Sequence, residues 1–431
     1  MAREMKDSGI EWIGEIPKGW EVVKVKNIFK NTKKIVGDRE KEFERLALTL
    51  KGVLKRDKND NKGLQSEKFS TYQILEKNEL VFKMIDLENK NTSRVGFSKH
   101  TGIVSPVYII LNNTKYTRYG YYFFYDMWQR YIFNTLGNNG VRSALNAKDM
   151  LNLPFLKLDL REQGKIVNYL DKKVTDIDLI IEKTKTTIEN YKKYKQSIIT
   201  EAVTKGLNPD VEMKDSGIKL IGQIPKQWKI RKIKSFLSVI SKGTTPKEIS
   251  SNKSEKYNIK YIKSENIFNG LVVDIPKFYI TSEINEELKR SQLQEDILFV
   301  IAGAGIGKTA IMPSSLLPAN TNQAVSFLRL KEEYKDYKKY LWYFLQSNIL
   351  KIYIELFSVQ SAQPNLSMEN LSNLKISLPE ISEVEKIADY LDKKVSEIDN
   401  LIFKKESLIN EMEEYKKSLI YECVTGKKEI I

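Results

Sequence analysis

Of all segments in this chain, the glycine-rich stretch at residues 302–309 (AGAGIGKT) is the most similar to a motif with a chemical function. Such a loop binds phosphate when its backbone amides cap a following helix and its lysine reaches the phosphate groups. That helix is not predicted here, because 309–313 is rich in β-formers and stops at a proline, and 320–330 has the pattern of another strand. We favour a tight turn between strands that lets the backbone, Lys308 and Thr309 approach DNA. A nucleotide-dependent enzyme using this turn is the alternative.

Other catalytic arrangements lack the residues that they need. The chain has one cysteine, Cys423, and one histidine, His100, which excludes a disulfide framework, a cysteine zinc site and most catalytic triads. Methyl transfer to adenine would need an Asn-Pro-Pro-aromatic motif, and the only Asn-Pro pair is Asn208-Pro209. Carboxylates beside lysines carry no information in a chain that is 29% charged. We therefore predict no catalytic residue and no metal site.

The charge balance predicts a polyanionic partner. The net charge is +15 and the pI is near 9.3, and a positive potential of this kind attracts phosphate groups. A generally lysine-rich proteome is the simpler alternative. Residues 1–9 lack the apolar core of a signal peptide, and apolar runs such as 297–302 are too short to span a bilayer. We expect a soluble cytoplasmic protein with no membrane partner.

Basic and amide side chains in predicted loops are the candidates for reading DNA. Arginine and lysine pair with guanine edges, and asparagine and glutamine pair with adenine edges. In the first half the candidates are Arg94, Asn138, Asn139 and Arg142. In the second half they are Lys242, Thr244, Thr245, Lys308, Thr309, Asn322, Gln323, Gln360 and Gln363. Taken singly, each is more simply interpreted as an ordinary surface residue.

An internal repeat organises the chain around these loops. Residues 5–20 (MKDSGIEWIGEIPKGW) recur as residues 213–228 (MKDSGIKLIGQIPKQW), with 12 of 16 positions identical. Each half begins with this segment, continues through a mixed region and ends in a long helical pattern. The chain is therefore a tandem duplication.

The long helical patterns carry a heptad seam in both halves. Apolar residues recur at steps of four and three, each 221 residues apart, and the interruptions at Thr184 and Lys195 recur at Lys405 and Lys416. The first seam comprises Leu170, Val174, Ile177, Ile181, Ile188, Tyr191, Ile198 and Ala202, and the second comprises Leu391, Val395, Ile398, Ile402, Ile409, Met412, Leu419 and Cys423. Because each helix has only one stripe to bury, the two copies are predicted to pair with each other.

The mixed regions predict α+β domains with short strands. Strands are expected at 45–50, 79–85, 94–98 and 105–111, and in the same order at 258–263, 296–302, 309–312 and 323–330. An aromatic amphipathic helix follows in each half, at 121–134 and at 340–356. The two regions barely agree in sequence between their matching frames. This is expected if both domains do one job on different targets.

These residues resemble the specificity subunit of type I restriction-modification systems. The resemblance rests on the duplicated Ser-Gly-x-x-x-Ile-Gly-x-Ile-Pro-x-x-Trp segment, on the turn 307–311 followed by Asn322-Gln323-Ala324, and on residues 162–171. The second copy departs from the family pattern, with Ser-Glu-Val at 382–384 where the first copy has Arg-Glu-Gln at 161–163.

The resemblance implies a non-catalytic, pseudo-two-fold scaffold in which two α/β target-recognition domains are separated by a pair of long antiparallel coiled-coil helices. We assign residues 1–157 and 208–378 to the recognition domains, and 158–207 and 379–431 to the helices. The implied partners are double-stranded DNA, two modification (methyltransferase) subunits and restriction (motor-nuclease) subunits. The chain itself holds no cofactor, since S-adenosylmethionine, ATP and magnesium belong to the partner subunits. A coiled-coil adaptor with no nucleic-acid role is a further alternative.

Overall fold

The computed structural model describes residues 3–430 except 59, 61–67, 90–91, 114, 137–143 and 358–363. The chain divides into two compact units. Unit 1 comprises Met1–Lys185 and Ser407–Ile431, and unit 2 comprises Thr186–Glu406. Each unit therefore contains one mixed region together with part of each long helix.

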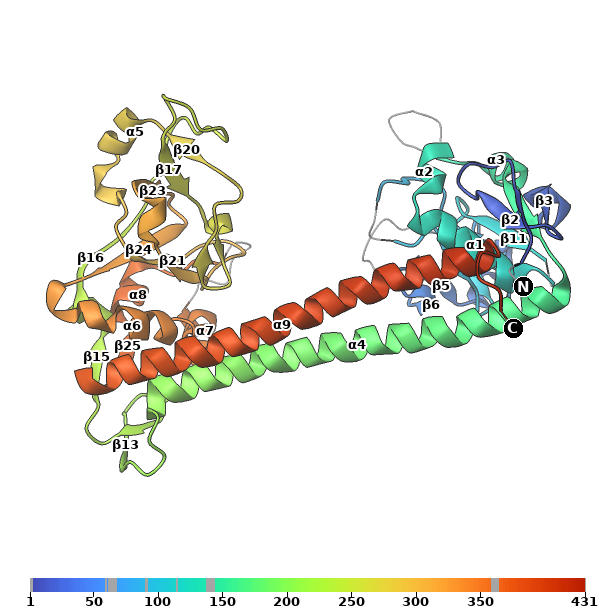
Figure 1. The fold of residues 1–431 in the computed structure, drawn as a ribbon. Coiled ribbons are helices and arrows are strands. Elements are labelled where there is room, and N and C mark those ends of the chain that lie inside the picture. Colours follow the sequence, from blue (N-terminus) through green and yellow to red (C-terminus); the bar gives the residue numbers. More distant parts are fainter. Residues whose placement is uncertain are drawn as a thin grey trace. The chain divides into compact units, whose positions relative to one another are not determined.

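The two long helices are α4 (Leu160–Lys205) and α9 (Ile381–Val424), and they lie side by side within each unit (Figure 1). In unit 1 Lys416 Nζ lies 2.6 Å from the Asp178 carboxylate, and in unit 2 Lys195 Nζ lies 2.6 Å from the Asp399 carboxylate. From 178 to 195 the chain advances along α4, and the partner residues on α9 run backwards by the same number of residues, from 416 to 399. The pairing is therefore antiparallel, as predicted. None of the described helices is long and apolar enough to cross a membrane.

Burial confirms the predicted heptad seam. Leu170 and Leu391 have no exposed surface, and the other seam positions are buried or half-buried. Thr184, one of the polar interruptions, is also buried, with 8% of its surface exposed. The seam therefore forms the contact between the helices over most of their length.

The repeated opening segment folds identically in both units. β1 (Met5–Asp7) pairs with β2 (Glu15–Pro17), and β13 (Met213–Asp215) pairs with β14 (Gln223–Pro225) in the same antiparallel register. The buried indole of Trp20 donates to Glu162 of α4 at 2.9 Å. In unit 2, Trp228 donates to Glu383 of α9 at 2.7 Å. The duplicated tryptophan thus fixes the segment to the first turn of the long helix that follows its own domain.

The segment after each tryptophan is a strand. β3 (Glu21–Lys24) pairs with β12 (Pro154–Lys157), and β15 (Lys229–Lys232) pairs with β25 (Lys375–Leu378). In each half the partner strand immediately precedes the long helix. These two-stranded ribbons therefore close each mixed region on itself.

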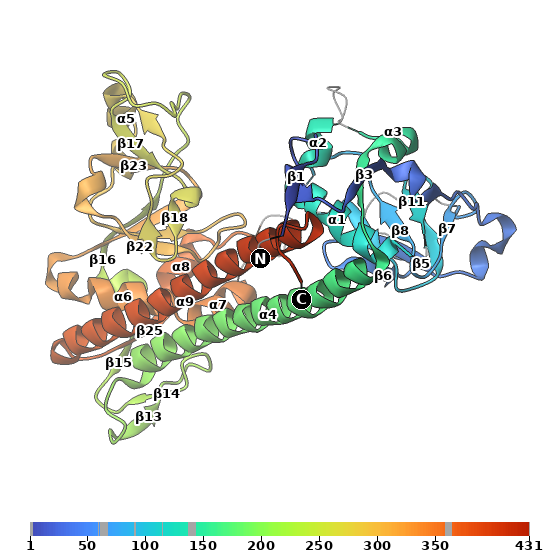
Figure 2. The same cartoon turned by 45° about the vertical axis from the view of Figure 1, so that its right-hand side comes forward.

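Unit 1 contains two four-stranded sheets beside helix α1 (Thr117–Gln129; Figure 2). One has the order β4-β11-β8-β9 and the other the order β6-β5-β10-β7. Their bounds are β4 (Lys30–Asn31), β5 (Arg45–Thr49), β6 (Gly52–Arg56), β7 (Gln73–Leu75), β8 (Leu80–Phe82), β9 (Val95–Phe97), β10 (Gly102–Val104) and β11 (Ile109–Asn112). The predicted strands are confirmed here as β5, β8, β9 and β11, whereas β4, β6, β7 and β10 were not predicted.

Unit 2 repeats this arrangement despite its divergent sequence. Its main sheet has the order β16-β24-β21-β22, and a second sheet has the order β20-β17-β23. Their bounds are β16 (Leu237–Lys242), β17 (Ile259–Ile262), β20 (Tyr279–Ile280), β21 (Ile297–Val300), β22 (Thr309–Ile311), β23 (Ala319–Thr321) and β24 (Val325–Leu330), with the hairpin β18 (Ile267–Phe268) and β19 (Leu271–Val272) beside them. Among the described strands each unit has one parallel pair, β5 with β10 and β17 with β23, and the two pairs occupy the same place in the order of strands.

Each predicted aromatic helix is divided in two. α1 (Thr117–Gln129) is followed by α2 (Ile132–Leu136), because Tyr131 adopts a left-handed backbone conformation with φ +58°. α6 (Lys338–Phe344) is followed after a turn by α7 (Asn348–Phe357). The single helices expected at 121–134 and 340–356 were therefore wrong in extent, since local backbone turns end them early. The shorter helices are α3 (Ala147–Asn152), α5 (Ser282–Glu287) and α8 (Met368–Asn373).

Tyrosines of these aromatic helices hold each mixed region to the long helices. Tyr122 donates to Asp171 and Tyr343 donates to Asp392, both at 2.6 Å. The fully buried Tyr119 hydroxyl donates to the Val424 carbonyl at the end of α9. Its counterpart Tyr340 donates to a carbonyl at the end of α4. Burial raises the pKa of all four phenols, so they remain neutral donors.

Candidate nucleic-acid interface

Three loops of unit 2 leave the main sheet at the same end. Lys242 at the end of β16 pairs with Ser326 of β24, Ser326 pairs with Phe299 of β21, and Phe299 pairs with Thr309 of β22. Because these four residues form one row across the sheet, the loops 243–245, 301–308 and 322–324 that adjoin them lie together. We call these three loops the unit 2 loop cluster.

Backbone hydrogen bonds connect the loops of this cluster. The Gly243 amide donates to the Asn322 carbonyl at 3.1 Å, and the Ile301 amide donates to the Ala324 carbonyl at 2.9 Å. A Cβ atom added at Gly243 would lie 1.9 Å from the Thr321 carbonyl oxygen, so only glycine permits this approach. The cluster is therefore a preformed surface built on a sheet.

Most of the predicted contact residues in unit 2 reach this surface. The exposed ones are Lys242, Thr244, Thr245, Lys308 and Gln323. The Thr245 hydroxyl and the Gln323 side-chain oxygen are hydrogen-bonded to each other. Half-buried Asn322 accepts from the Ala324 amide through its side-chain oxygen at 3.2 Å. Lys242, Lys308 and the hydrogen-bonded side-chain amide of Gln323 thus lie at one end of the main sheet of unit 2.

Thr309 does not belong to this surface. Its side chain is 3% exposed, and its hydroxyl donates to the Leu298 carbonyl at 2.7 Å. Its position at the start of β22 turns the hydroxyl into the hairpin. The expectation that Thr309 approaches DNA through its side chain is therefore not supported, while its neighbour Lys308 remains exposed.

Five predicted contact residues lie outside the described residues. They are Asn138, Asn139, Arg142, Gln360 and Gln363. The described neighbours of the last two join the unit 2 loop cluster, because the Gly303 amide donates to the Pro364 carbonyl at 3.1 Å. In unit 1 the Leu145 amide donates to the Met84 carbonyl at 2.9 Å, as the Leu366 amide donates to the Ile301 carbonyl at 2.9 Å in unit 2.

Arg94 has a structural role in unit 1. It is 1% exposed, and its guanidinium donates to the backbone carbonyls of Asp86 and Asn89 in the loop between β8 and β9. Burial lowers the pKa of this guanidinium, although an arginine stays charged at neutral pH. Arg94 therefore shapes the loop from inside, and its placement argues against direct contact with bases.

Lys83 is a residue in this loop that the sequence did not single out. It follows β8 directly, is half-buried, and its Nζ lies 3.4 Å from the Thr92 hydroxyl. Burial lowers its pKa, and the nearby charge of Arg94 lowers it further. A lysine directly after an apolar strand was the available signal. The described loops of unit 1 thus present Lys83 at the end of the sheet where unit 2 presents Lys308.

The glycine-rich turn lacks the context of a nucleotide-binding loop. Residues 301–308 connect the antiparallel strands β21 and β22, and no helix follows the turn whose amides could cap a phosphate. The nucleotide-enzyme alternative is therefore not supported by the local fold. Among the described residues, no three histidine, cysteine, aspartate or glutamate side chains gather as metal ligands would.

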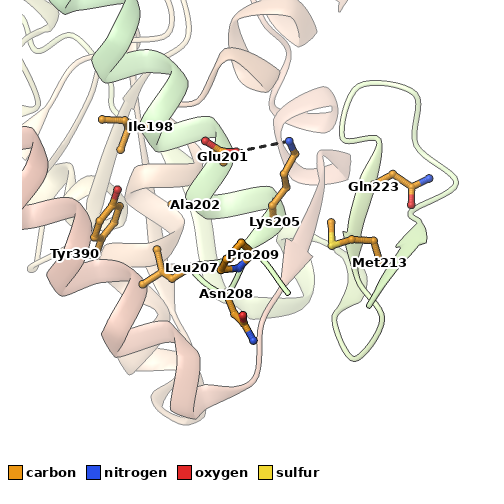
Figure 3. A pocket seen from close by; sticks show the side chains of 11 residues that line it. Ile198, Glu201, Ala202, Lys205, Leu207, Asn208, Pro209, Met213, Gln223 and Tyr390 are labelled. Atoms are coloured by element: carbon orange, nitrogen blue, oxygen red, sulfur yellow. Dashed lines mark ion pairs between the residues drawn. The ribbon is translucent and has the colours of Figure 1, made fainter. Parts of the chain in front are cut away.

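A hollow of about 810 Å³ lies elsewhere in unit 2, at the end of α4 (Figure 3). Ile198, Leu207 and Tyr390 give it apolar walls, and its ion pair joins Lys205 to Glu201 at 3.7 Å. It includes no residue of the unit 2 loop cluster. This hollow offers no arrangement of groups for acid–base or nucleophilic chemistry.

Comparisons with known proteins agree with this arrangement. The family model described as the type I restriction modification DNA specificity domain matches residues 225–411. The chain is 26% identical over 403 residues to the type I restriction enzyme MjaVIII specificity subunit of Methanocaldococcus jannaschii, covering 90% of this chain and 88% of that protein. It is 32% identical over 191 residues to the putative MjaX specificity subunit of the same organism, covering 42% of each.

A solved structure has the same fold. It is a chain from a study of complex assembly and conformational transition in a type I restriction-modification system, with a TM-score of 0.68 at 14% identity. The match covers 95% of this chain and 98% of that one. The duplicated frame, the paired long helices and these relatives lead to one conclusion: residues 225–411 match the type I restriction modification DNA specificity domain, and the chain as a whole is similar to type I restriction enzyme specificity subunits.

Proposed function

We propose that this chain is the DNA sequence-recognition subunit of a type I restriction-modification complex, with one mixed region reading each half of a bipartite site. The observation that carries the proposal is that the sheet is built alike in both units while the loops at its end differ. The strand order of the main sheet is the same in both units, whereas the loops at its end differ in length, sequence and exposed side chains. Constant scaffolds with variable loops suit two readers of different targets.

The net charge of +15 supports a nucleic-acid partner. Lys242 and Lys308 with Gln323 offer unit 2 groups that pair with base edges or phosphates, and Lys83 offers unit 1 a cation at the corresponding sheet end. On this proposal the candidate contact residues of unit 2 act from a preformed surface, and recognition requires little rearrangement of the loops.

The assembled complex supplies the chemistry on this proposal. Two modification subunits would methylate adenine with S-adenosylmethionine, and restriction subunits would cleave DNA with ATP and magnesium. The chain itself would bring no catalytic group. The purified chain should therefore show neither methylation nor cleavage, and methylation should appear when the modification subunit is added.

The helix pair would set the spacer between the two half-sites. α4 and α9 have 46 and 44 residues, so each is about 65–70 Å long at about 1.5 Å per residue. The matching heptad seams would fix where one helix begins along the other. Helix pairing would then determine how many base pairs separate the two halves of the site.

An exchange of recognition regions tests the proposal. Residues about 23–145 are replaced by those of a relative with a known target, and methylated positions are mapped with the modification subunit present. We expect one half-site to change while the other half-site and the spacer remain. The reciprocal exchange of residues about 231–366 should change the other half-site alone. If either exchange alters both half-sites, the two regions do not read independently and the proposal fails.

A further inference from the structure

A groove of about 650 Å³ runs along α4 in unit 2, away from the loop cluster. Its floor is apolar, since Ile221 and Ile349 are buried and Leu220 is half-buried. Its rim is basic, with Lys192, Lys193, Lys205 and Lys351 among the lining residues. Polar side chains of the same helix, including Gln196 and Thr200, also line the groove.

Part of this positive charge has no counter-ion. Lys192 pairs with Glu189 at 3.1 Å, and Lys205 pairs with Glu201 at 3.7 Å. Lys193 and Lys351 are exposed, and neither forms an ion pair with any residue that the structure describes. Two free cations therefore stand over an apolar floor.

The corresponding place in unit 1 is filled. Trp12 stands at the repeat position of Leu220, and Tyr421 stands at the position of Thr200. Arg130 donates to the Trp12 carbonyl and lies 4.3 Å from the Tyr421 ring, while the Tyr421 hydroxyl donates to the Ile13 carbonyl at 3.3 Å. In unit 1 the large side chains of Trp12 and Tyr421, with their hydrogen bonds, thus occupy the place of the groove. In unit 2 the smaller side chains of Leu220 and Thr200 leave the groove open.

The charge of the helix is also reversed between the two places. Glu413 and Glu414 of α9 occupy the repeat positions of Lys192 and Lys193 of α4. The basic groove of unit 2 is therefore not repeated at the equivalent place in unit 1. Its combination of small lining residues and free lysines is specific to unit 2.

We propose that this groove is a docking site for an acidic amphipathic segment of a partner protein. Apolar side chains of the segment would cover Leu220, Ile221 and Ile349, and its carboxylates would pair with Lys193 and Lys351. A DNA backbone would satisfy the lysines but offers no apolar side chains for the floor. The proposal concerns a surface outside the DNA-reading loops and does not depend on how those loops act.

A binding measurement on the full chain tests the charge requirement. The probe is a fluorescent 14-residue helical peptide with leucines on one face and glutamates on its flanks, followed by anisotropy. We expect saturable binding that weakens with salt and becomes roughly tenfold weaker in Lys193→Glu with Lys351→Glu. The control, Lys172→Glu with Lys173→Glu, changes two exposed lysines of the same helix outside the groove and should bind as the wild type does.

A filling variant tests the groove itself. Leu220→Trp copies the residue of unit 1 and leaves every lysine in place, so it should also abolish peptide binding, with circular dichroism confirming the fold. Unchanged binding in Leu220→Trp would overturn the proposal, because the lysines alone would then hold the peptide. A non-specific DNA duplex whose affinity falls in the Lys193/Lys351 variant as much as that of the peptide would overturn it too, since the groove would then bind phosphate. Absence of peptide binding to the wild type has the same consequence.

Discussion

Lys195 and Asp399 form an ion pair of 2.6 Å between α4 and α9, and the repeat of this pair is Lys416 with Asp178, also at 2.6 Å. Both lysines stand at interruptions of the heptad seam, and each lies 221 residues from its counterpart. Two of the four interruptions, Lys195 and Lys416, are therefore paired with acidic residues of the opposite helix. A charged pair at one fixed level opposes sliding of the helices, because a shifted register would leave both groups without a partner.

The Lys195–Asp399 pair is expected to contribute modestly to stability. The side chains are 22% and 43% exposed, so solvent screens the attraction. A double-mutant cycle with Lys195→Ala and Asp399→Ala should give a coupling of about 0.5–1 kcal/mol in urea unfolding. The charge-swapped variant, Lys195→Asp with Asp399→Lys, should recover most of that coupling. A coupling indistinguishable from zero would show that the pair does not fix the register.

Lys308 is expected to affect DNA binding and not nucleotide binding. Lys308→Ala removes an exposed cation from the unit 2 loop cluster, and affinity for duplexes carrying the cognate site should fall roughly tenfold. Lys331→Ala, which changes an exposed lysine beyond the opposite end of β24, is the matched control and should bind normally. Loss of ATP binding by the isolated chain in Lys308→Ala would instead favour the nucleotide-enzyme interpretation.

Asp126 is expected to make stability depend on pH. It is 4% exposed, and burial raises its pKa to about 6 from 3.8 although Arg130 lies 3.1 Å away. The folded state therefore holds the proton more tightly than the unfolded state, and this contribution is lost as pH rises from about 4 through 6. A shift of about 2 units corresponds to about 3 kcal/mol.

Comparison with Asp126→Asn isolates this contribution. The difference in unfolding free energy between the wild type and the variant should change over pH 4–7, with the wild type losing stability relative to the variant as pH rises. Thermal unfolding at constant ionic strength across this range gives the measurement. A difference that stays constant with pH would mean that the carboxyl of Asp126 does not titrate there.

Matched insertions test whether the helices set the spacer. Seven residues added at equivalent positions of α4 and α9 preserve both seams and lengthen the pair by about 10 Å, which is about three base pairs of DNA at roughly 3.4 Å each. Methylation mapping should then show a longer spacer between unchanged half-sites. Insertion of two residues rotates the seam away from its partner and should reduce stability and methylation together. A folded, assembled heptad variant that still selects the original spacer would contradict the proposal.

The sequence predicts the frame of this fold well and its loops poorly. The heptad seam and the duplicated tryptophan segment are predictable because each occurs twice at a fixed offset. Arg94 and Lys308 show the limit. Arg94 directly precedes β9 in unit 1 and Lys308 directly precedes β22 in unit 2, and both strands end the corresponding sheets. Arg94 is nevertheless buried, whereas Lys308 is exposed. The carbonyls of Asp86 and Asn89 accept hydrogen bonds from the Arg94 guanidinium, whereas no residue that the structure describes holds the Lys308 ammonium in this way. Such burial depends on loop packing that residue types alone do not specify.

The hydrogen bond from Tyr119 to the Val424 carbonyl has a consequence for synthesis on the ribosome. Its two residues are 305 positions apart, and unit 1 combines Met1–Lys185 with Ser407–Ile431. Unit 2 is one continuous stretch, Thr186–Glu406. Two distant segments can pack together only after both have emerged from the ribosome. Unit 1 is therefore complete only after the end of α9 has been translated, whereas all residues of unit 2 have been translated before that. The order in which the two domains mature is the reverse of the order in which they are made.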